Sequence, residues 1–171
     1  VKAMKMGRGT EDGVQIGPLV NDDAVEGSHE LVSDAAGKGA TITVGGSIPE
    51  GPGSYYPATV LTDVTPDARL LKEEIFGPVL AIVPFDSEEE AVRLANDTEY
   101  GLVSYVYTQD LGRGMRMIEK LQTGMMGLNA GVISNAAAPF GGVKQSGIGR
   151  EGSFEGIEEY LTTKYTFVPR A

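Results

Sequence analysis

The spacing of apolar residues predicts an irregular start followed by a helix. Residues 1–20 are punctuated by glycine and only weakly periodic, which is typical of an extended connection. Over residues 24–36 apolar side chains recur at mostly three- and four-residue intervals, as on the buried face of a helix. Asn21 or Asp22 is placed to cap this helix, and Gly37 and Gly39 are placed to end it.

Three segments in the next part of the chain have the residue types of strands. Residues 40–44 alternate between polar and apolar side chains, and residues 55–64 are rich in Val, Leu, Thr and Tyr. Pro57 within the second segment predicts an edge or irregular position, because proline cannot donate a ladder hydrogen bond. Residues 79–83 are an unbroken apolar run of the kind found in a buried strand.

The second half of the chain alternates between helix and strand patterns. Ser87 and Glu90 have the spacing of a capping box, so the acidic run between them indicates a helix start and not a catalytic group. Strand patterns follow at residues 102–107 and 124–129, on either side of a helix pattern at residues 111–121.

The last helix pattern rests on Leu111, Met115, Ile118 and Leu121. It includes Gly112 and Gly114, which are unfavourable in a helix. The alternation of strands and helices predicts an α/β fold, in which helices cover an open, parallel-type sheet. Ligands of such sheets bind beyond the carboxyl ends of the strands. Asn129 and the loop after it would lie at that edge.

Composition and charge exclude several classes of protein. The chain has 171 residues, enough for one domain with a sizeable core, and 41% of them are apolar. A net charge of -10 and the lack of a basic stripe argue against a nucleic-acid partner. No apolar run approaches a membrane span and Val1 begins no signal-peptide core, so a cytoplasmic protein is expected.

The residue types needed for most metal and thiol chemistry are absent. With no cysteine the sequence offers no thiolate nucleophile, disulfide or Cys-based metal site, and its one histidine, His29, excludes a two-histidine site. We therefore expect no metal. His29 lies amid polar residues, so we expect it on the surface without a catalytic role.

Residues 73–79 are the first candidate for ligand chemistry. Two carboxylates, Glu73 and Glu74, and the ring of Phe76 precede a Gly-Pro break and the apolar run. A turn that ends in a core strand is held rigidly, so it could present one carboxylate and one flat ring to a ligand. The alternative is an exposed acidic turn with Phe76 in the core.

The second candidate is a glycine-rich stretch, residues 130–152, which has no helical or strand periodicity. Ordered loops of this length in compact domains are usually functional. It does not match a P-loop, because Lys144 follows Val143 and the glycine-lysine-serine order is missing. It does not match a dinucleotide fingerprint either, because no strand and helix bracket a G-x-G-x-x-G motif.

Together these stretches resemble the NAD(P)-dependent aldehyde dehydrogenase superfamily. The resemblance rests on residues 73–79, on Asn129 and on residues 139–147, in that order, and it covers essentially the whole chain. Residues 133–135 and 143–152 are most similar to the subgroup that oxidises succinate semialdehyde. The fold implied is the family's α/β catalytic domain.

The resemblance assigns roles to individual residues. Glu74 would bond the hydroxyls of the nicotinamide ribose of NAD or NADP, and Phe76 would pack beside that ribose and the nicotinamide. Asn129 and Phe140 would lie near the substrate tunnel, and Ser134 would help to hold the distal carboxylate of succinate semialdehyde. For Ser134 the alternative is a loop serine that faces water.

The resemblance also divides the chain and assigns it a function. Residues 1–159 would be the C-terminal part of the catalytic domain, and residues 160–171 an oligomerisation strand and tail that joins a homodimer or homotetramer. The family's cysteine nucleophile and general-base glutamate lie upstream in the family pattern, so no catalytic residue is expected here. We expect a fragment that is inactive alone, from an enzyme that oxidises succinate semialdehyde to succinate. The alternative is a noncatalytic module that binds a protein partner through its glycine-rich loop or terminal strand.

Overall fold

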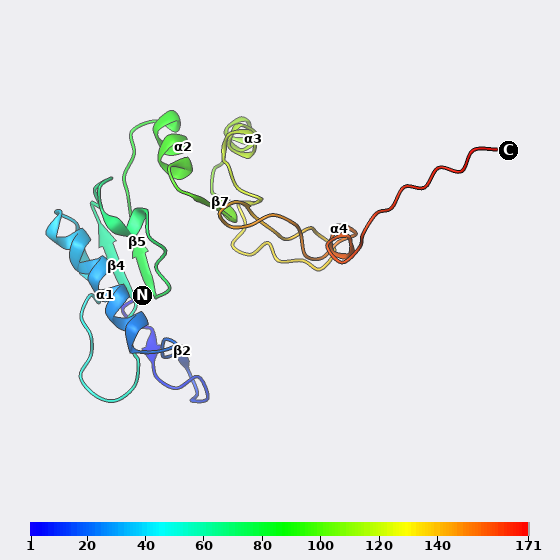
Figure 1. Ribbon diagram of the computed structural model, residues 1–171. Helices are drawn as coiled ribbons and strands as arrows, with labels where there is room; N and C mark the ends of the chain where they lie inside the picture. The colour runs from blue at the N-terminus through cyan, green and yellow to red at the C-terminus, as the bar shows by residue number, and fades with distance from the viewer. Residues whose placement is uncertain (171) are drawn as a thin grey trace. The chain divides into compact units, whose positions relative to one another are not determined.

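The computed structural model describes residues 1–170 and separates into two compact units, a division that length alone did not indicate. Unit 1 comprises Val1–Asp86, and unit 2 begins at Ser87. Each unit mixes helices with small open sheets, which confirms the α/β class (Figure 1). Within residues 1–170, no helix combines the length and apolarity needed to cross a membrane.

Unit 1 is built on a three-stranded sheet with one long helix beside it. The sheet has the order β3-β4-β5, in which β3 is antiparallel and β5 parallel to the central β4. Figure 1 shows α1 running along this sheet, and its apolar face joins the strands in one core. The elements are β1 (Lys5–Met6), β2 (Val14–Ile16), α1 (Asp22–Gly37), β3 (Thr41–Val44), β4 (Thr59–Thr62), the 3₁₀ helix η1 (Arg69–Leu71) and β5 (Val79–Ala81).

Helix α1 forms where the apolar spacing predicts it. Asn21 is the N-cap: its side-chain oxygen accepts a hydrogen bond from the Ala24 N–H at 2.9 Å. The buried face consists of Val25, Ser28, Leu31, Val32 and Ala35. The stretch before α1, predicted as an irregular connection, contains the short parallel pair of β1 and β2.

One expectation about the unit 1 sheet is confirmed in one of its two forms, and one is wrong. Pro57 lies in an irregular position and not on an edge strand, because the central strand β4 begins at Thr59 and leaves Pro57 outside the ladder. β5 is the edge strand and not a buried one: Leu80 is 54% exposed, whereas Val79 and Ala81 pack on the core. Proline position and apolar run length did not reveal which strand has two neighbours.

His29 is half-buried, which corrects its expected place on the surface. Its Nδ1 lies 3.4 Å from the hydroxyl of Tyr56, a side chain with no exposed area. Burial raises the pKa of the Tyr56 hydroxyl. The contact joins α1 to the segment before β4, so His29 has a packing role in unit 1.

Unit 2 contains one parallel and one antiparallel strand pair. β7 pairs with β8 in parallel, as the strand-helix-strand pattern predicts, and β6 pairs with β9 in antiparallel. β5, the strand that precedes this pattern, belongs instead to the unit 1 sheet. The elements are α2 (Glu88–Asn96), β6 (Tyr100–Gly101), β7 (Val103–Val106), α3 (Leu111–Lys120), β8 (Met125–Leu128), β9 (Val143–Lys144) and α4 (Glu155–Glu158).

The acidic start of α2 is structural, as its capping spacing predicts. Ser87 Oγ accepts a hydrogen bond from the Glu90 N–H at 3.1 Å. Glu88 accepts two hydrogen bonds from the guanidinium group of Arg116 on α3, both at 2.7 Å. Arg116 is the main cause of the lowered pKa of Glu88, which falls to about 2. The carboxylate therefore ties α2 to α3.

Helix α3 buries a different face from the one predicted. Leu111, Met115 and Ile118 are exposed in this chain and Leu121, the C-cap, is half-buried, whereas the buried residues are Gly114 and Met117. A Cβ at Gly114 would lie 3.0 Å from the side chain of Leu128, so the missing side chain lets α3 approach β8. Gly114, which is unfavourable for an isolated helix, is therefore a residue at which α3 packs closely against β8.

The chain after α4 has no helix or strand within residues 161–170 and runs as an extended segment (Figure 1). Its aromatic and apolar side chains are exposed, including Tyr165 and Phe167. Ala171, the last residue of the predicted oligomerisation strand and tail, lies outside the described residues. Pairing of this segment with a second chain stays a prediction.

Candidate functional site

The acidic turn of unit 1 lies between η1 and β5 and borders helix α1. The turn and the helix line a pocket of about 300 Å³. Its lining includes Ala24, Gly27, Ser28, Glu30 and Leu31 from α1, and Arg69, Glu73, Glu74, Ile75 and Phe76 from the opposite wall. The first candidate segment therefore borders a cavity within one compact unit.

The turn is held by residues that alternate with its exposed side chains. Ile75 is half-buried and packs against the unit 1 core. Gly77 lies so close to α1 that a Cβ there would collide with the hydroxyl group of Ser28. Glu74 and Phe76 are left on the outside, and Phe76 is 79% exposed. The alternative that places Phe76 in the core is wrong.

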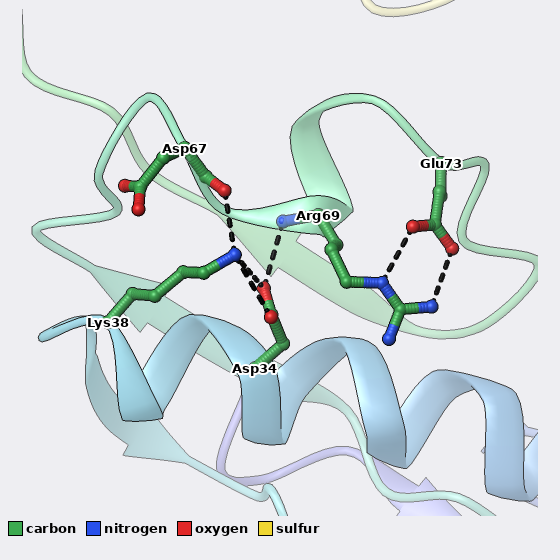
Figure 2. Close-up of polar contacts among 5 residues, drawn as sticks. All are labelled: Asp34, Lys38, Asp67, Arg69 and Glu73. Carbon is green, nitrogen blue, oxygen red and sulfur yellow. Dashed lines mark hydrogen bonds and ion pairs between the residues drawn. The ribbon is translucent and has the colours of Figure 1, made fainter.

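The two adjacent carboxylates differ in their contacts. Arg69 Nε and Nη2 donate to the two carboxylate oxygens of Glu73 at 2.7 and 2.8 Å (Figure 2). These hydrogen bonds hold the pKa of Glu73 below its usual value. Among residues 1–170, Glu74 has no side-chain hydrogen bond or ion pair. Glu74 is therefore the carboxylate available to a ligand.

The start of η1 is tied to helix α1 by a second charged contact. Asp34 Oδ2 accepts hydrogen bonds from the Arg69 N–H at 2.9 Å and from Lys38 Nζ at 3.0 Å. Lys38 Nζ also donates to the carbonyl oxygen of Asp67 at 2.8 Å (Figure 2). The Arg69 and Lys38 hydrogen bonds lower the pKa of Asp34.

Asn129 lies directly after β8, at the carboxyl edge of the parallel pair. Its side-chain amide donates to the Thr108 carbonyl and accepts from the Thr108 N–H, each at 2.9 Å. Its φ of 54° is in the left-handed region, which asparagine tolerates better than most residues. The amide joins the ends of β7 and β8, and the carboxyl edge has a pocket that Asn129 lines with Tyr107 and Asp110.

Ser134 and Phe140, the other predicted substrate residues, lie apart from that pocket lining. Ser134 is exposed and makes no side-chain hydrogen bond within residues 1–170. Phe140 is half-buried, pairs through its backbone with Glu151 and lines a separate cavity of about 750 Å³. Of these two cavities, one is lined by Asn129 and the other by Phe140, and Ser134 is in neither lining.

The cations of the glycine-rich loop are engaged by backbone carbonyls. Lys144 Nζ donates to the carbonyl oxygens of Asn96 and Thr98 at 3.0 and 3.1 Å, which closes the end of α2. Arg150 Nη1 donates to the carbonyls of Gly142 and Gly149 at 2.9 and 2.6 Å. These hydrogen bonds, together with the pairing of β9 with β6, hold the glycine-rich stretch in an ordered conformation, although its sequence has no strand periodicity.

Arg69 and Asp34 are the site residues that sequence reasoning missed. Arg69 and Glu73 are four residues apart, a spacing that signals an ion pair on a helical turn. Asp34 is 35 residues from Arg69 and gave no local signal. Residues 1–170 contain no group of His, Cys, Asp and Glu side chains suited to hold a metal ion.

A family model described as the aldehyde dehydrogenase family matches residues 1–166. The chain belongs to the aldehyde dehydrogenase family. It is 52% identical over 163 residues to a succinate-semialdehyde dehydrogenase of Paenarthrobacter nicotinovorans, covering 95% of this chain and 36% of that protein. It is 49% identical over 162 residues to a 3-sulfolactaldehyde dehydrogenase of Pseudomonas putida, covering 95% of this chain and 33% of that protein.

Solved aldehyde dehydrogenase structures agree with the fold. The crystal structure of succinate-semialdehyde dehydrogenase from Burkholderia pseudomallei superposes with a TM-score of 0.89 at 52% identity, covering 92% of this chain and 33% of that one. This aldehyde dehydrogenase chain thus spans about a third of the length of the relatives it matches. The resemblance inferred from residues 73–79 and 139–147 is confirmed.

Proposed function

We propose that this chain is part of an NAD(P)-dependent aldehyde dehydrogenase that oxidises succinate semialdehyde to succinate. The observation that carries the proposal is the unpaired Glu74 beside the exposed ring of Phe76, in a chain that belongs to the aldehyde dehydrogenase family. Aldehyde dehydrogenases as a family use NAD or NADP, and the chemistry that the cofactor supplies is hydride acceptance.

The residues of the turn fit a nicotinamide ribose. A vicinal diol presents two O–H donors, and a free carboxylate has two oxygens that can accept both at once. Both carboxylate oxygens of Glu73 already accept a hydrogen bond from Arg69, so Glu74 is the residue of the pair assigned to the diol. Phe76 offers a flat apolar face one residue further on, and its position would restrict how the ribose and nicotinamide lie.

The substrate assignment rests on the succinate-semialdehyde dehydrogenases among the relatives and on Ser134. An exposed hydroxyl with no partner among the described residues can donate to a carboxylate of the substrate. We assign Ser134 to the distal carboxylate, and Asn129 and Phe140 to the walls of the substrate tunnel. Asn129 would act by holding the ends of β7 and β8, since its amide is engaged by Thr108.

The C-terminal segment is assigned to subunit assembly. Residues 160–171 would add a strand to a sheet of a second subunit in a homodimer or homotetramer, since within residues 161–170 the apolar side chains are exposed and no residue belongs to a helix or strand. Residues 1–159 would form the C-terminal part of the catalytic domain. A cytoplasmic location is proposed on the sequence argument alone.

Glu74→Gln in the complete enzyme tests the cofactor role. Loss of one charge-assisted hydrogen bond predicts a slower hydride transfer or cofactor release by about tenfold to a hundredfold, with the fold unchanged. Glu26→Gln, at an exposed carboxylate of α1 outside the turn, is the matched control and should behave as wild type. Stopped-flow traces in which Glu74→Gln leaves both steps unchanged would contradict the proposal.

A panel of aldehydes tests the substrate. The complete enzyme should have its highest kcat/KM with succinate semialdehyde. The comparison compounds are the semialdehydes one carbon longer or shorter, 3-sulfolactaldehyde and an uncharged aldehyde of the same length. If kcat/KM is higher for one of them, that compound takes the place of succinate semialdehyde as the proposed substrate.

A further inference from the structure

Four charged residues join the acidic turn to helix α1. The carboxylate of Asp34 on α1 accepts hydrogen bonds from the Arg69 N–H at 2.9 Å and from Lys38 Nζ at 3.0 Å. Lys38 Nζ also donates to the carbonyl oxygen of Asp67 at 2.8 Å (Figure 2). The side chain of Asp34 is 19% exposed, so this contact is partly shielded from water. The backbone at the start of η1 is therefore attached to the helix from two sides.

Arg69 then bridges η1 to Glu73. Its guanidinium group makes the bidentate contact with Glu73 at 2.7 and 2.8 Å. In parallel, the Glu73 N–H donates to the Arg69 carbonyl oxygen at 2.8 Å. Backbone and side chain thus connect the same two residues, which restricts rotation about the peptide that leads to Glu74.

The other end of the turn is attached to α1 as well. Gly77 approaches Ser28 more closely than any residue with a Cβ could. Ser28 and Asp34 are six positions apart on α1, about 9 Å along the helix axis at 1.5 Å per residue. The segment that carries Glu74 and Phe76 therefore spans two fixed points on one rigid helix.

The Arg69 contact also separates the roles of the two carboxylates. While Glu73 is paired, its charge is balanced by Arg69 and each of its oxygens accepts one hydrogen bond, which also lowers its pKa. Without Arg69, two free carboxylates would stand side by side, repel each other and compete for the same ligand hydroxyls. Pairing one of them leaves Glu74 alone to face the ligand.

We propose that Arg69 and Glu73, anchored through Asp34 and Lys38, are positioning residues that aim Glu74 at the cofactor ribose. The inference rests on the cofactor role of Glu74 proposed above. An exposed ion pair contributes little to the stability of a fold. A displacement near 1 Å, however, can slow a reaction by about a hundredfold. The network should therefore affect orientation more than stability.

The first test measures order in the chain itself, without a cofactor. Arg69→Met keeps an unbranched apolar stem but removes the guanidinium group, and with it both hydrogen bonds to Glu73. Backbone ¹⁵N relaxation should show the order parameters of Glu74 and Phe76 falling from about 0.85 to below about 0.6. Arg93→Met, which breaks the exposed pair with Glu90 in unit 2, is the control and should leave both values unchanged.

The second test uses the complete enzyme. Arg69→Met should lower kcat about tenfold or more while the Tm stays near that of wild type, because orientation and not folding is changed. Glu73→Gln keeps the shape of the side chain and one acceptor oxygen, so it should lower kcat by a smaller factor. This variant provides the test if Arg69→Met does not fold. Arg93→Met should retain wild-type kcat.

The two tests separate this inference from the function on which it rests. Wild-type order parameters at Glu74 and Phe76 in both Arg69→Met and Glu73→Gln overturn the positioning role. So does an unchanged kcat in both variants when Glu74→Gln slows the enzyme. If Glu74→Gln has no effect, the cofactor role fails, and the relaxation data alone decide whether the network orders the turn.

Discussion

Leu61→Ala tests the finding that β4 is the centre of the unit 1 core. Leu61 has no exposed area and lies between Ile42 of β3 and Ala81 of β5 in the strand register. It belongs to the same buried cluster as Val32 of α1 and Tyr56. Strands on both sides and a helix nearby leave little freedom for the surroundings to fill the space of the lost atoms.

The expected loss follows from this enclosure. Replacing a buried leucine by alanine costs about 2 to 5 kcal/mol, and the cost rises with the cavity that remains. For a site that cannot collapse we expect about 3 to 4 kcal/mol. In a unit the size of Val1–Asp86 this lowers the Tm by roughly 12 to 32 °C. Leu80→Ala on the edge strand should cost about 1 kcal/mol or less, since that side chain is 54% exposed.

A urea titration followed by NMR measures both variants. The amide signals of Val60 in β4 and Ser104 in β7 report on units 1 and 2 separately. Leu61→Ala should lower the urea midpoint of the Val60 signal far more than Leu80→Ala does. Equal losses in the two variants, or a larger loss for Leu80→Ala, would refute the assignment of β4 as the core strand and β5 as the edge.

Three further predictions concern the unit 2 ion pairs, the substrate and activity. The pKa of Glu88 is lowered to about 2, so its stabilising contribution is full above its unfolded value near 4.5 and is lost as the pH falls toward 2. Glu88→Gln should therefore lower the Tm at pH 7 and leave it unchanged near pH 2, and an equal Tm difference at both pH values would be inconsistent with this. In the complete enzyme, Ser134→Ala should lower kcat/KM for succinate semialdehyde about tenfold, chiefly through KM, and spare an uncharged aldehyde of similar length; equal losses would show that Ser134 does not select the carboxylate. The 171-residue chain alone should not reduce NAD or NADP with any aldehyde, because it has no cysteine nucleophile, and turnover proportional to protein would disprove this.

Helix starts were predictable because their signals are local. Asn21 and Ser87 each bond an N–H three residues ahead, and the same spacing is visible in the sequence. The family was predictable for a related reason: residues 73–79 and 139–147 are contiguous stretches whose order can be read directly.

Burial was less predictable, because it depends on neighbours that are distant in the chain. Leu80 and Leu61 are both apolar residues in strands, but only Leu61 has strands on two sides. On α3 the apolar residue Leu111 is exposed, whereas Gly114 is buried because Leu128 lies against it. Side-chain type alone does not specify these contacts.

The candidate site shows the same division between local and distant information. The sequence is enough to show that two carboxylates and an aromatic ring stand together before a Gly-Pro break, and its motifs identify the family. That Glu73 is paired and Glu74 is free becomes visible in the folded chain, because Arg69 is held in place by Asp34, which lies 35 positions away on α1. Hydrogen bonding depends on distance in space, and that distance exists only once α1 and the turn have packed together.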